Sequence, residues 1–506
     1  MRPPRSPRAP FALALLLAGA ALASPATAVT GPAPGTLAPL GPQFPVLMSI
    51  GKGTSVQGVV EAQDGKLYIY GLFDNAGGDP TADGVAVYDP VDGSVRGLGG
   101  TNTVNGPLGD EITDVAIVNG TVYAAGPFTQ IANGSGTQTA FGLAEWDGTD
   151  WSPTFGIRGT FQELEAVGST LFAAGKITRV GATTVTNGLL ARLDGSTWSL
   201  VDDVPTTNDG VGDMRVLADG RLLVVGTFTD AGANPDADDI AVVSPATGQF
   251  QALVPAGSFT TGHPRTAVFL GTRLFIGGNF IGVGGNPLAS HVVEWTGTAF
   301  KALGNGGNPS LPPLALDIAP PELGRVVDLE VSGANLLVRG TFVSAGGLDG
   351  TEGFAAWNGT KWMGLNAYES LRQGDGGIDI LGRTAALCGT EIDSFTGLTT
   401  TVGVGLFGLP GNPSAPRSLV GASRLKSVRL TWAAPASSNG SPITDYTIQF
   451  RVKGTTAWRT FADGVSATRA ATVTGLKSGV TFQFRVRART DWGIGGFSTI
   501  ISAKAG

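Results

Sequence analysis

The feature that most constrains this chain is a short pattern that recurs about every 50 residues. The stretch RLLVVGTFTDAG (221–232) is an apolar run that ends at a glycine, with a phenylalanine two residues further on. The pattern recurs with its run-ending glycine at Gly71, Gly126, Gly175, Gly226, Gly278, Gly340 and Gly389. A period near 50 residues is typical of solenoids, propellers and other repeat arrays. The pattern is therefore a structural unit and not one local turn.

Each period contains four short apolar runs separated by turn residues. In the second period the runs are 112–118, 121–126, 142–147 and 150–155. These are strand lengths with turn punctuation, and four antiparallel strands per period is the layout of a propeller blade. The runs are apolar at successive positions, as a sheet covered on both faces requires. We expect the glycine to permit a close backbone approach and the phenylalanine to pack between neighbouring blades.

The two ends of the array predict how it closes. The last copy lacks a fourth strand, whereas Phe44–Leu47, before the first copy, has the aromatic-x-x-Leu form of the fourth strands elsewhere. We expect this run to pair into the last unit and remove its exposed edge. The run GVGLFG (403–408) also matches a dinucleotide-binding fingerprint, but Leu409-Pro410-Gly411 follows in place of the helix that receives the pyrophosphate. We interpret it as the last strand of the array.

The chain changes character after residues 411–416, which have the composition of a linker. Residues 417–506 contain well-spaced strands of alternating polarity and resemble a fibronectin type III domain. Trp432, Tyr446 and Leu476 fall where that sandwich places its core. The predicted fold class is therefore all-β: a seven-bladed β-propeller over residues 40–410, followed by an immunoglobulin-like fibronectin type III sandwich.

The repeats also carry a family resemblance. The motif G-x-F-x-x-A-G is followed by A-x-W-D/N-G-x-x-W, as in Ala144-Glu145-Trp146-Asp147-Gly148 with Trp151. This combination resembles the kelch-like and galactose-oxidase-like propellers of secreted bacterial proteins and the cortical polarity-marker proteins. The resemblance implies a propeller fold. The copper chemistry of galactose oxidase is not expected, because the chain does not supply its histidines and modified cysteine at the required places.

The N-terminal residues and the charge indicate where the protein acts. Three arginines precede an apolar run (11–22) and an Ala-Thr-Ala site that ends at residue 28, so residues 1–28 read as a secretory signal peptide. The apolar run is shorter than the roughly 20 residues of a membrane span. Without these arginines the net charge of -7 becomes -10. We found no Lys/Arg cluster, so nucleic acid is not an expected partner, and the single Cys388 cannot form an internal disulfide.

Five loop residues are the candidate ligand-binding site. His263, His291, Asp236, Asp238 and Asp239 lie in loops that propeller topology places on one face. Imidazoles and carboxylates together suit a divalent cation or a general acid/base pair. The alternative is that these are solvated loop residues with no common target. No metal is specified, and no other cofactor is expected.

The first functional prediction is a secreted, non-enzymatic binding or scaffold protein, monomeric, that recognises an extracellular protein or glycan through its loops. The alternative is a secreted hydrolase or lyase acting on polysaccharide, with the fibronectin type III module as a spacer. A compact group of carboxylates around the central channel favours this alternative, and a channel lined by Ala, Gly and Thr disfavours it. A structural component of a surface layer or matrix is a third possibility. Fold resemblance carries much of this prediction, which makes it an association and not a mechanism.

Overall fold

The structure is a computed structural model that describes residues 33–34, 37–39, 55–98, 106–107, 111–201, 207–304, 314–315, 325–365, 376–389 and 403–506. These residues form antiparallel β-sheets joined by turns and short 3-10 helices. The predicted signal peptide (1–28) and the predicted closing strand Phe44–Leu47 lie outside the described residues.

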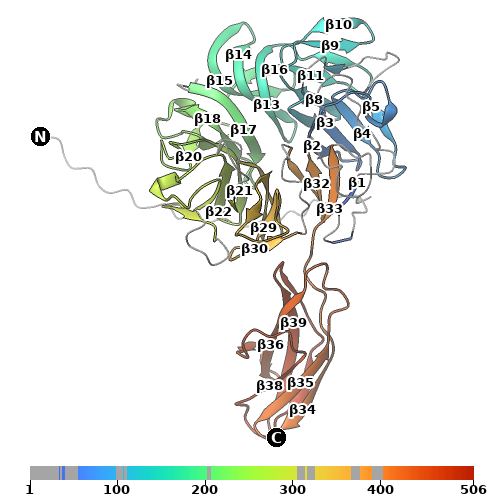
Figure 1. Cartoon of the computed structure of the whole chain (residues 1–506), viewed down its shortest axis with the longest axis vertical. Helices are drawn as coiled ribbons and strands as arrows, with labels where there is room; N and C mark the ends of the chain where they lie inside the picture. The colour runs from blue at the N-terminus through green and yellow to red at the C-terminus, as the bar shows by residue number, and fades with distance from the viewer. Residues whose placement is uncertain are drawn as a thin grey trace, which may run out of the picture.

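Seven four-stranded antiparallel sheets occupy the described part of residues 37–408 (Figure 1). The first three are β2 (Ser55–Glu61), β3 (Leu67–Leu72), β4 (Val85–Tyr88) and β5 (Val95–Gly97); β7 (Asp114–Val118), β8 (Thr121–Ala125), β11 (Leu143–Trp146) and β12 (Trp151–Pro153); and β13 (Ile157–Val167), β14 (Thr170–Val180), β15 (Thr183–Asp194) and β16 (Thr197–Leu200). The next two are β17 (Thr207–Val216), β18 (Leu222–Thr229), β19 (Ile240–Val243) and β20 (Phe250–Ala252); and β21 (Pro264–Leu270), β22 (Arg273–Gly278), β23 (Val292–Trp295) and β24 (Phe300–Ala302). The last two are β26 (Arg325–Ser332), β27 (Asn335–Thr341), β29 (Phe354–Trp357) and β30 (Trp362–Gly364); and β31 (Ile378–Leu381), β32 (Thr384–Cys388), β33 (Val404–Gly408) and β1 (Leu37–Pro39).

Each sheet arises from the repeat in the way that its glycine and aromatic residue predict. A Cβ added at Gly226 would lie 2.4 Å from the backbone oxygen of Gly210, so only glycine allows the first two strands to approach this closely. Phe228 is 1% exposed and packs with the apolar residues of β17 to β19. The turns fit as well, since Asn119 and Gly120 both adopt positive φ, as a two-residue hairpin requires. The close backbone approach expected at the glycine is confirmed, and the phenylalanine is buried.

Neighbouring sheets are joined by side-chain packing and not by backbone ladders. The first strands β2, β7, β13, β17, β21, β26 and β31 each contact the first strand of the next sheet, and β31 contacts β2. Apolar clusters span two sheets at a time; one cluster contains Tyr123 of β8 together with Phe161 and Leu164 of β13. Burial between the sheets explains why the strands are apolar on both faces.

The predicted fold class, a closed seven-bladed β-propeller followed by the sandwich, is corrected by the strand pairing. The pairing supports an all-β chain of many separate antiparallel sheets, because every backbone ladder ends within its own sheet and no ladder among the described residues closes them into a barrel. The physical reason is that hairpin pairing satisfies each sheet locally, so a 50-residue period predicts a sheet but does not dictate closure. The expected pairing strand differs too: β1 (Leu37–Pro39), upstream of Phe44–Leu47, pairs with β33.

The C-terminal residues form a two-sheet sandwich. One sheet contains β34 (Arg417–Arg424), β35 (Ser427–Ala433) and β38 (Ala470–Val473); the other contains β37 (Arg459–Phe461), β36 (Ile443–Val452), β39 (Thr481–Thr490), β40 (Ile494–Phe497) and β41 (Ile501–Lys504). Trp432, Tyr446 and Leu476 are buried in its core, as expected. The alternation predicted for β39 is also confirmed, because Phe482, Phe484, Val486 and Ala488 all point into that core.

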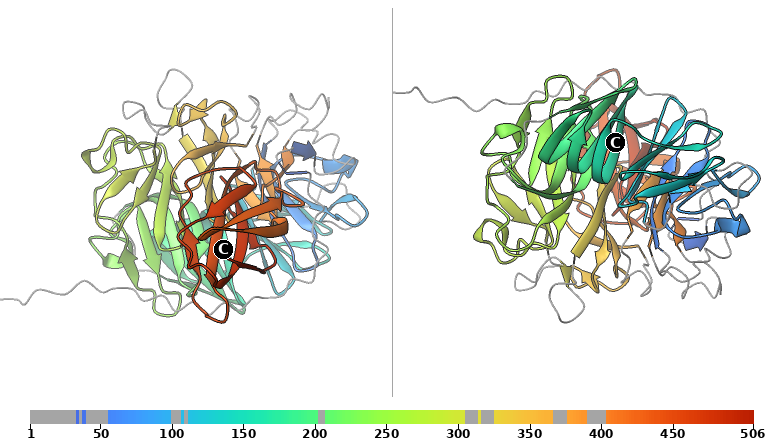
Figure 2. Two further views of the ribbon diagram at one scale, coloured as in Figure 1. Left: turned by 90° about the horizontal axis from the view of Figure 1, so that it is seen from below. Right: turned by 90° about the horizontal axis from the view of Figure 1, so that it is seen from above.

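The sandwich projects from the seven sheets near β31 to β33 (Figure 1) and covers only part of them when viewed end-on (Figure 2). Trp492, in the β39–β40 turn, is buried among apolar residues of the last two sheets. The side-chain amide of Asn335 donates a 2.9 Å hydrogen bond to the Trp492 carbonyl, and Lys361 forms a 2.8 Å ion pair with Asp491. The junction therefore combines an apolar contact with specific polar contacts.

Candidate functional site

A pocket of about 1050 Å³ lies between the first strands of the sheets. Its lining comes from β2, β7, β13, β17, β21, β26 and β31, so each of the seven sheets contributes. Carboxylates dominate its polar lining: Asp114, Glu163, Glu165, Asp213, Asp328, Glu330 and Asp379. This is the arrangement that the sequence analysis associated with the enzymatic alternative.

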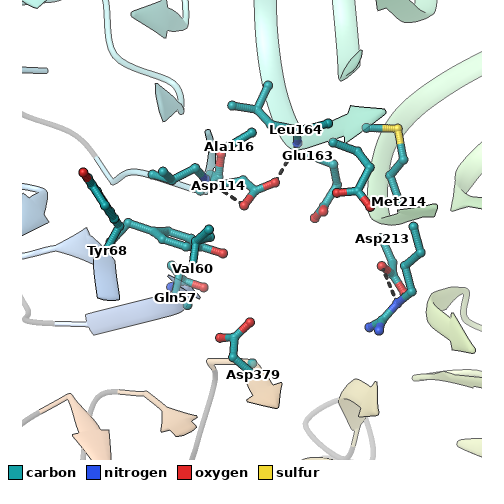
Figure 3. A pocket seen from close by; sticks show the side chains of 18 of the residues that line it. Gln57, Val60, Tyr68, Asp114, Ala116, Glu163, Leu164, Asp213, Met214 and Asp379 are labelled. Atoms are coloured by element: carbon teal, nitrogen blue, oxygen red, sulfur yellow. Dashed lines mark hydrogen bonds and ion pairs between the residues drawn. The ribbon is translucent and has the colours of Figure 1, made fainter. Parts of the chain in front are cut away.

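Bulges in several of the first strands lie next to acidic side chains that face the pocket. Five of the seven first strands shift register against the second strand, for example between Phe161 and Glu163 in β13 and between Val211 and Asp213 in β17. A bulge places two residues opposite one and redirects the side chain that follows. Figure 3 shows Asp114, Glu163, Asp213 and Asp379 directed toward the same space from different sheets.

Four of the aspartates hydrogen-bond to the backbone of the next sheet. Their side-chain oxygens accept from Leu164 N (Asp114, 2.6 Å), Ala267 N (Asp213, 3.0 Å), Ile378 N (Asp328, 2.8 Å) and Val59 N (Asp379, 2.8 Å). Each bond links the first strand of one sheet to that of its neighbour. Because an unpaired buried N–H is costly, these bonds give the carboxyl groups a structural role.

Arg215 of β17 organises one side of the pocket. Its guanidinium forms ion pairs with Asp213 (2.8 Å), Asp328 (2.7 Å) and Glu330. Thr266 also donates a 2.8 Å hydrogen bond to Asp213. Arg215 offsets part of the charge of these side chains, but burial still raises the pKa of Asp328 to about 7.

Three other pocket acids, Asp114, Glu163 and Asp379, form no ion pair with a cation among the described residues, although Arg215 lies near enough to Glu163 to lower its pKa. Burial raises the pKa of Asp114 to about 7, against the lowering effect of the Leu164 and Val115 N–H groups. Burial also raises the pKa of Asp379 well above its usual value, and that of Glu163 likewise, with nearby Asp114 adding to the shift of Glu163. Near neutral pH Asp114 is therefore partly protonated, and burial favours the protonated forms of Glu163 and Asp379, so the pocket carries less negative charge than its composition indicates.

The first sheet replaces the carboxylate with a phenol. Gly58 follows the bulge in β2, and a Cβ there would lie 2.2 Å from the Tyr70 hydroxyl oxygen. The Tyr70 side chain reaches over the glycine and hydrogen-bonds Asp114. Burial raises the pKa of Tyr70 well above its usual value. The phenol is neutral and serves as a hydrogen-bonding partner within the pocket.

Two of the five residues predicted from the sequence act as turn residues. Asp239 and His291 each precede the third strand of a sheet, with positive φ of 57° and 64°. Each donates its backbone N–H to the motif phenylalanine: Asp239 to Phe228 O at 3.0 Å and His291 to Phe280 O at 2.9 Å. Glycines hold the equivalent position in other sheets: Gly84, Gly142 and Gly353.

The environments of these two side chains differ. His291 is 4% exposed, its Nδ1 has no hydrogen-bond partner in the described part of the chain, and burial lowers its pKa to about 4, so the imidazole is neutral. Burial raises the pKa of Asp239 to about 7, and Asp238 adds to the shift. The imidazole is therefore neutral, and the Asp239 carboxyl is partly protonated near neutral pH.

The other three predicted residues are solvent-accessible. His263 and Asp236 are exposed, and Asp238 is half-buried and accepts a 3.1 Å hydrogen bond from the Asp230 N–H. Across the ranges that the structure describes, no group of three or more His, Cys, Asp or Glu side chains is placed to hold a metal ion. Ligand binding by the five residues stays a prediction from the sequence.

Sequence reasoning missed the pocket carboxylates. The sequence does contain a signal for them, which is an acidic residue in the first strand of successive periods. Examples are Asp114, Glu163 and Asp213, which are separated by 49 and then 50 residues. In an alternating strand such a residue is typical of a solvent-facing position, so the pattern alone does not separate the two readings.

Comparison with known proteins identifies the C-terminal sandwich. The family model of the fibronectin type III domain matches residues 414–504, which contain both sheets and the buried Trp432 core. Residues 414–504 form a fibronectin type III domain. The comparisons give no support for the kelch-like or galactose-oxidase-like part of the resemblance.

The similar proteins are matched over short stretches. Protein turtle of Drosophila melanogaster is 36% identical over 93 residues, which are 18% of this chain and 6% of that protein. The titin homolog of Caenorhabditis elegans is 30% identical over 129 residues, 26% of this chain and 1% of that protein. The chain therefore spans a small fraction of the length of these curated relatives.

Solved structures also match only a short part of this chain. The chicken CNTN1 FN1-FN3 domains are 27% identical, with 19% of this chain and 33% of that chain covered and a TM-score of 0.18. The structure of titin kinase and its flanking domains is 29% identical, with coverages of 19% and 17% and a TM-score of 0.18.

No helix in the described ranges has the length and hydrophobicity needed to cross a membrane.

Proposed function

We propose that this protein is an exported, non-enzymatic binding or scaffold protein that recognises an extracellular protein or glycan through the loops of its sheet region. The proposal includes export by residues 1–28, release from the cell or loose association with its surface, and a monomeric state. The main observation behind this proposal is that acidic side chains of the pocket hydrogen-bond to the backbone of a neighbouring sheet and so hold the sheets together.

The bonds around the pocket support this assignment. Asp114, Asp328 and Asp379 each accept a hydrogen bond from a backbone N–H of an adjacent sheet at 2.6 to 2.8 Å. These bonds give each of the three carboxyl groups a role in holding neighbouring sheets together. A rigid set of sheets with exposed connecting loops suits binding, since binding residues are concentrated on loops held by a scaffold.

The test is an interaction screen with the full chain. Glycan arrays and pull-down from extracellular fractions should yield a saturable ligand, and loop variants should weaken its binding without lowering the thermal unfolding temperature. A chain that binds no glycan and no extracellular protein would contradict the proposal.

A polysaccharide hydrolase or lyase is the second candidate, and Glu163 favours it. Glu163 lines the pocket, is directed into it, and has no hydrogen-bond partner among the described contacts. Its raised pKa is suited to a general acid. The test is release of reducing or unsaturated sugar ends from a polysaccharide panel, with Glu163→Gln as the inactivated variant. Product release that Glu163→Gln abolishes would establish this function.

A further inference from the structure

The fibronectin type III domain differs in charge from the rest of the chain. Residues 414–506 contain 13 Lys and Arg and three Asp, a net charge of +10. The whole chain carries -7, so residues 1–413 carry -17. Single-sign surfaces of this size attract oppositely charged partners at long range. The negative net charge of the whole chain therefore does not reveal that this domain is basic.

Three arginines of the domain lie in one row, separated by aromatic rings. The Arg451 and Arg485 guanidinium carbons lie 4.4 and 4.2 Å from the centre of the Trp458 ring. The Arg485 and Arg487 carbons lie 3.9 and 4.8 Å from the centre of the Phe497 ring. The contacts therefore run in the order Arg451, Trp458, Arg485, Phe497, Arg487, which we call the arginine row; Arg485 and Arg487 are both on β39.

The arginine row is on the outer face of the sheet. Phe484, Val486 and Ala488 of β39 point into the sandwich core, so the alternate residues Arg485 and Arg487 point away from it. Each of the three arginines is half-buried by the rings beside it and retains contact with solvent. The row is thus presented by a rigid sheet and not by a loop.

No carboxylate of the described residues forms an ion pair with the arginine row. Arg451 and Arg485 donate instead to neutral side-chain oxygens: Arg451 Nε to Gln483 at 2.9 Å, and Arg485 Nε and Nη2 to Gln449 at 2.9 and 2.6 Å. Arg487 Nε is buried without a hydrogen-bond partner in the described part of the chain. Partial burial, and then repulsion from Arg451 and Arg487, lowers the pKa of Arg485. The glutamines orient the guanidinium groups while their charge stays uncompensated.

We infer that the arginine row binds an acidic polysaccharide through its sulfate or carboxylate groups. The guanidinium fork matches such groups in a bidentate way, and stacking on the rings holds each fork in place before binding. The aromatic rings are occupied by guanidinium groups and are not available to stack on a sugar. We therefore expect recognition through charge and hydrogen bonds. An extended polymer carries anionic groups along its length, so one chain can satisfy three cations in a row. This inference deepens the proposed function by naming a ligand class and a site.

The experiment measures binding of the full chain to heparin and to polygalacturonate, which provide sulfate and carboxylate groups. The test variant is R451Q/R485Q/R487Q. The matched control is R424Q/K426Q/R429Q, which removes the same charge from exposed positions on β34, β35 and the turn between them. We expect the test variant to bind at least one polymer about tenfold more weakly near 0.15 M salt and the control to lose less than about threefold. Neutral dextran should not bind.

Several results would overturn the inference: no binding of the unmodified chain to either polymer, an equal loss in the control variant, or tighter binding to single-stranded DNA or to phosphatidylserine vesicles. If R451Q/R485Q/R487Q does not fold, the variant R451K/R485K/R487K is tested in its place. Lysine keeps the positive charge but lacks the guanidinium fork, so weakened polymer binding supports the inference. Unchanged polymer binding contradicts it. A protein partner found in a pull-down, with no polyanion bound, removes this inference and leaves the proposed function intact. If neither a polyanion nor an extracellular protein or glycan binds, both this inference and the proposed function are contradicted.

Discussion

The carboxyl group of Asp379 on β31 accepts a 2.8 Å hydrogen bond from the backbone N–H of Val59 on β2, 320 residues earlier in the chain. This bond joins the last sheet to the first. Val59 is 2% exposed, so its N–H has no access to water as an alternative partner.

Asp379→Ala should destabilise the sheet region by about 1 to 3 kcal/mol, because it leaves the Val59 N–H buried and unpaired. Calorimetry measures the effect as a lower unfolding temperature. Asp379→Asn is the matched control, since its amide oxygen can still accept the bond, and we expect a loss of less than about 1 kcal/mol. Equal stability of the Ala variant and the unmodified chain would show that the link is dispensable.

The stability of the protein should fall as the pH rises through 7. Asp114 has a pKa of about 7 in the folded chain against 3.8 in the unfolded chain, so the folded state holds the extra proton between these values. This contribution is fully present below about pH 4 and is lost as the pH passes 7, with a slope of at most about 1.4 kcal/mol per pH unit for one proton. Asp114→Asn should flatten the dependence of unfolding free energy on pH over this range. An unchanged slope in the variant would assign the titration to other groups.

Asp239 should be replaceable by glycine but not by alanine. Its φ of 57° suits glycine, which holds the equivalent position in other sheets, and its half-buried carboxyl contributes no ion pair in the described structure. Asp239→Gly should leave thermal stability within about 1 kcal/mol of the unmodified chain, whereas Asp239→Ala should lose about 1 to 2 kcal/mol through left-handed strain. The same scans with Ca²⁺ or Zn²⁺ address the predicted metal site. Stabilisation by either ion that disappears in Asp238→Ala and His291→Gly would establish a metal site, and we expect no such stabilisation.

Trp492 should couple the fibronectin type III domain to the sheets. Its ring is buried at the junction, and its carbonyl accepts the Asn335 hydrogen bond. Trp492→Ala should lower the stability of the junction by about 3 to 5 kcal/mol and separate the unfolding of the two parts in calorimetry. Lys361→Ala removes only the exposed ion pair with Asp491 and should cost less than about 1 kcal/mol. A single unchanged transition in Trp492→Ala would contradict this coupling.

The local structure followed from the sequence because its causes are local. Gly226 and Phe228 are constrained by the backbone contact and burial that every copy of the repeat needs, so their spacing predicts their roles. Trp432 was placed correctly in the sandwich core for the same reason. The predicted closed propeller went further than strand pairing supports, since the backbone ladders end at the edge of each sheet.

The pocket was not predicted, because its causes are not local. Asp379 and Val59 meet only after the whole sheet region has folded, and a bulge in β13 decides that Glu163 points inward. His291 was singled out because histidine is chemically versatile, yet its position is set by a turn that glycine occupies in other sheets. The arginine row was missed because its three arginines lie on two strands, β36 and β39. They become neighbours only when these strands pair.

The most direct test of the proposed function is one experiment in which ligand binding and product release are measured together. The full chain is incubated with a panel of acidic and neutral polysaccharides, bound ligand is quantified by isothermal titration calorimetry, and released sugar ends are assayed in the same samples. We predict saturable binding with no sugar ends released above the buffer control. Release of sugar ends by the unmodified chain, abolished in Glu163→Gln, would contradict the account and make the pocket an active site.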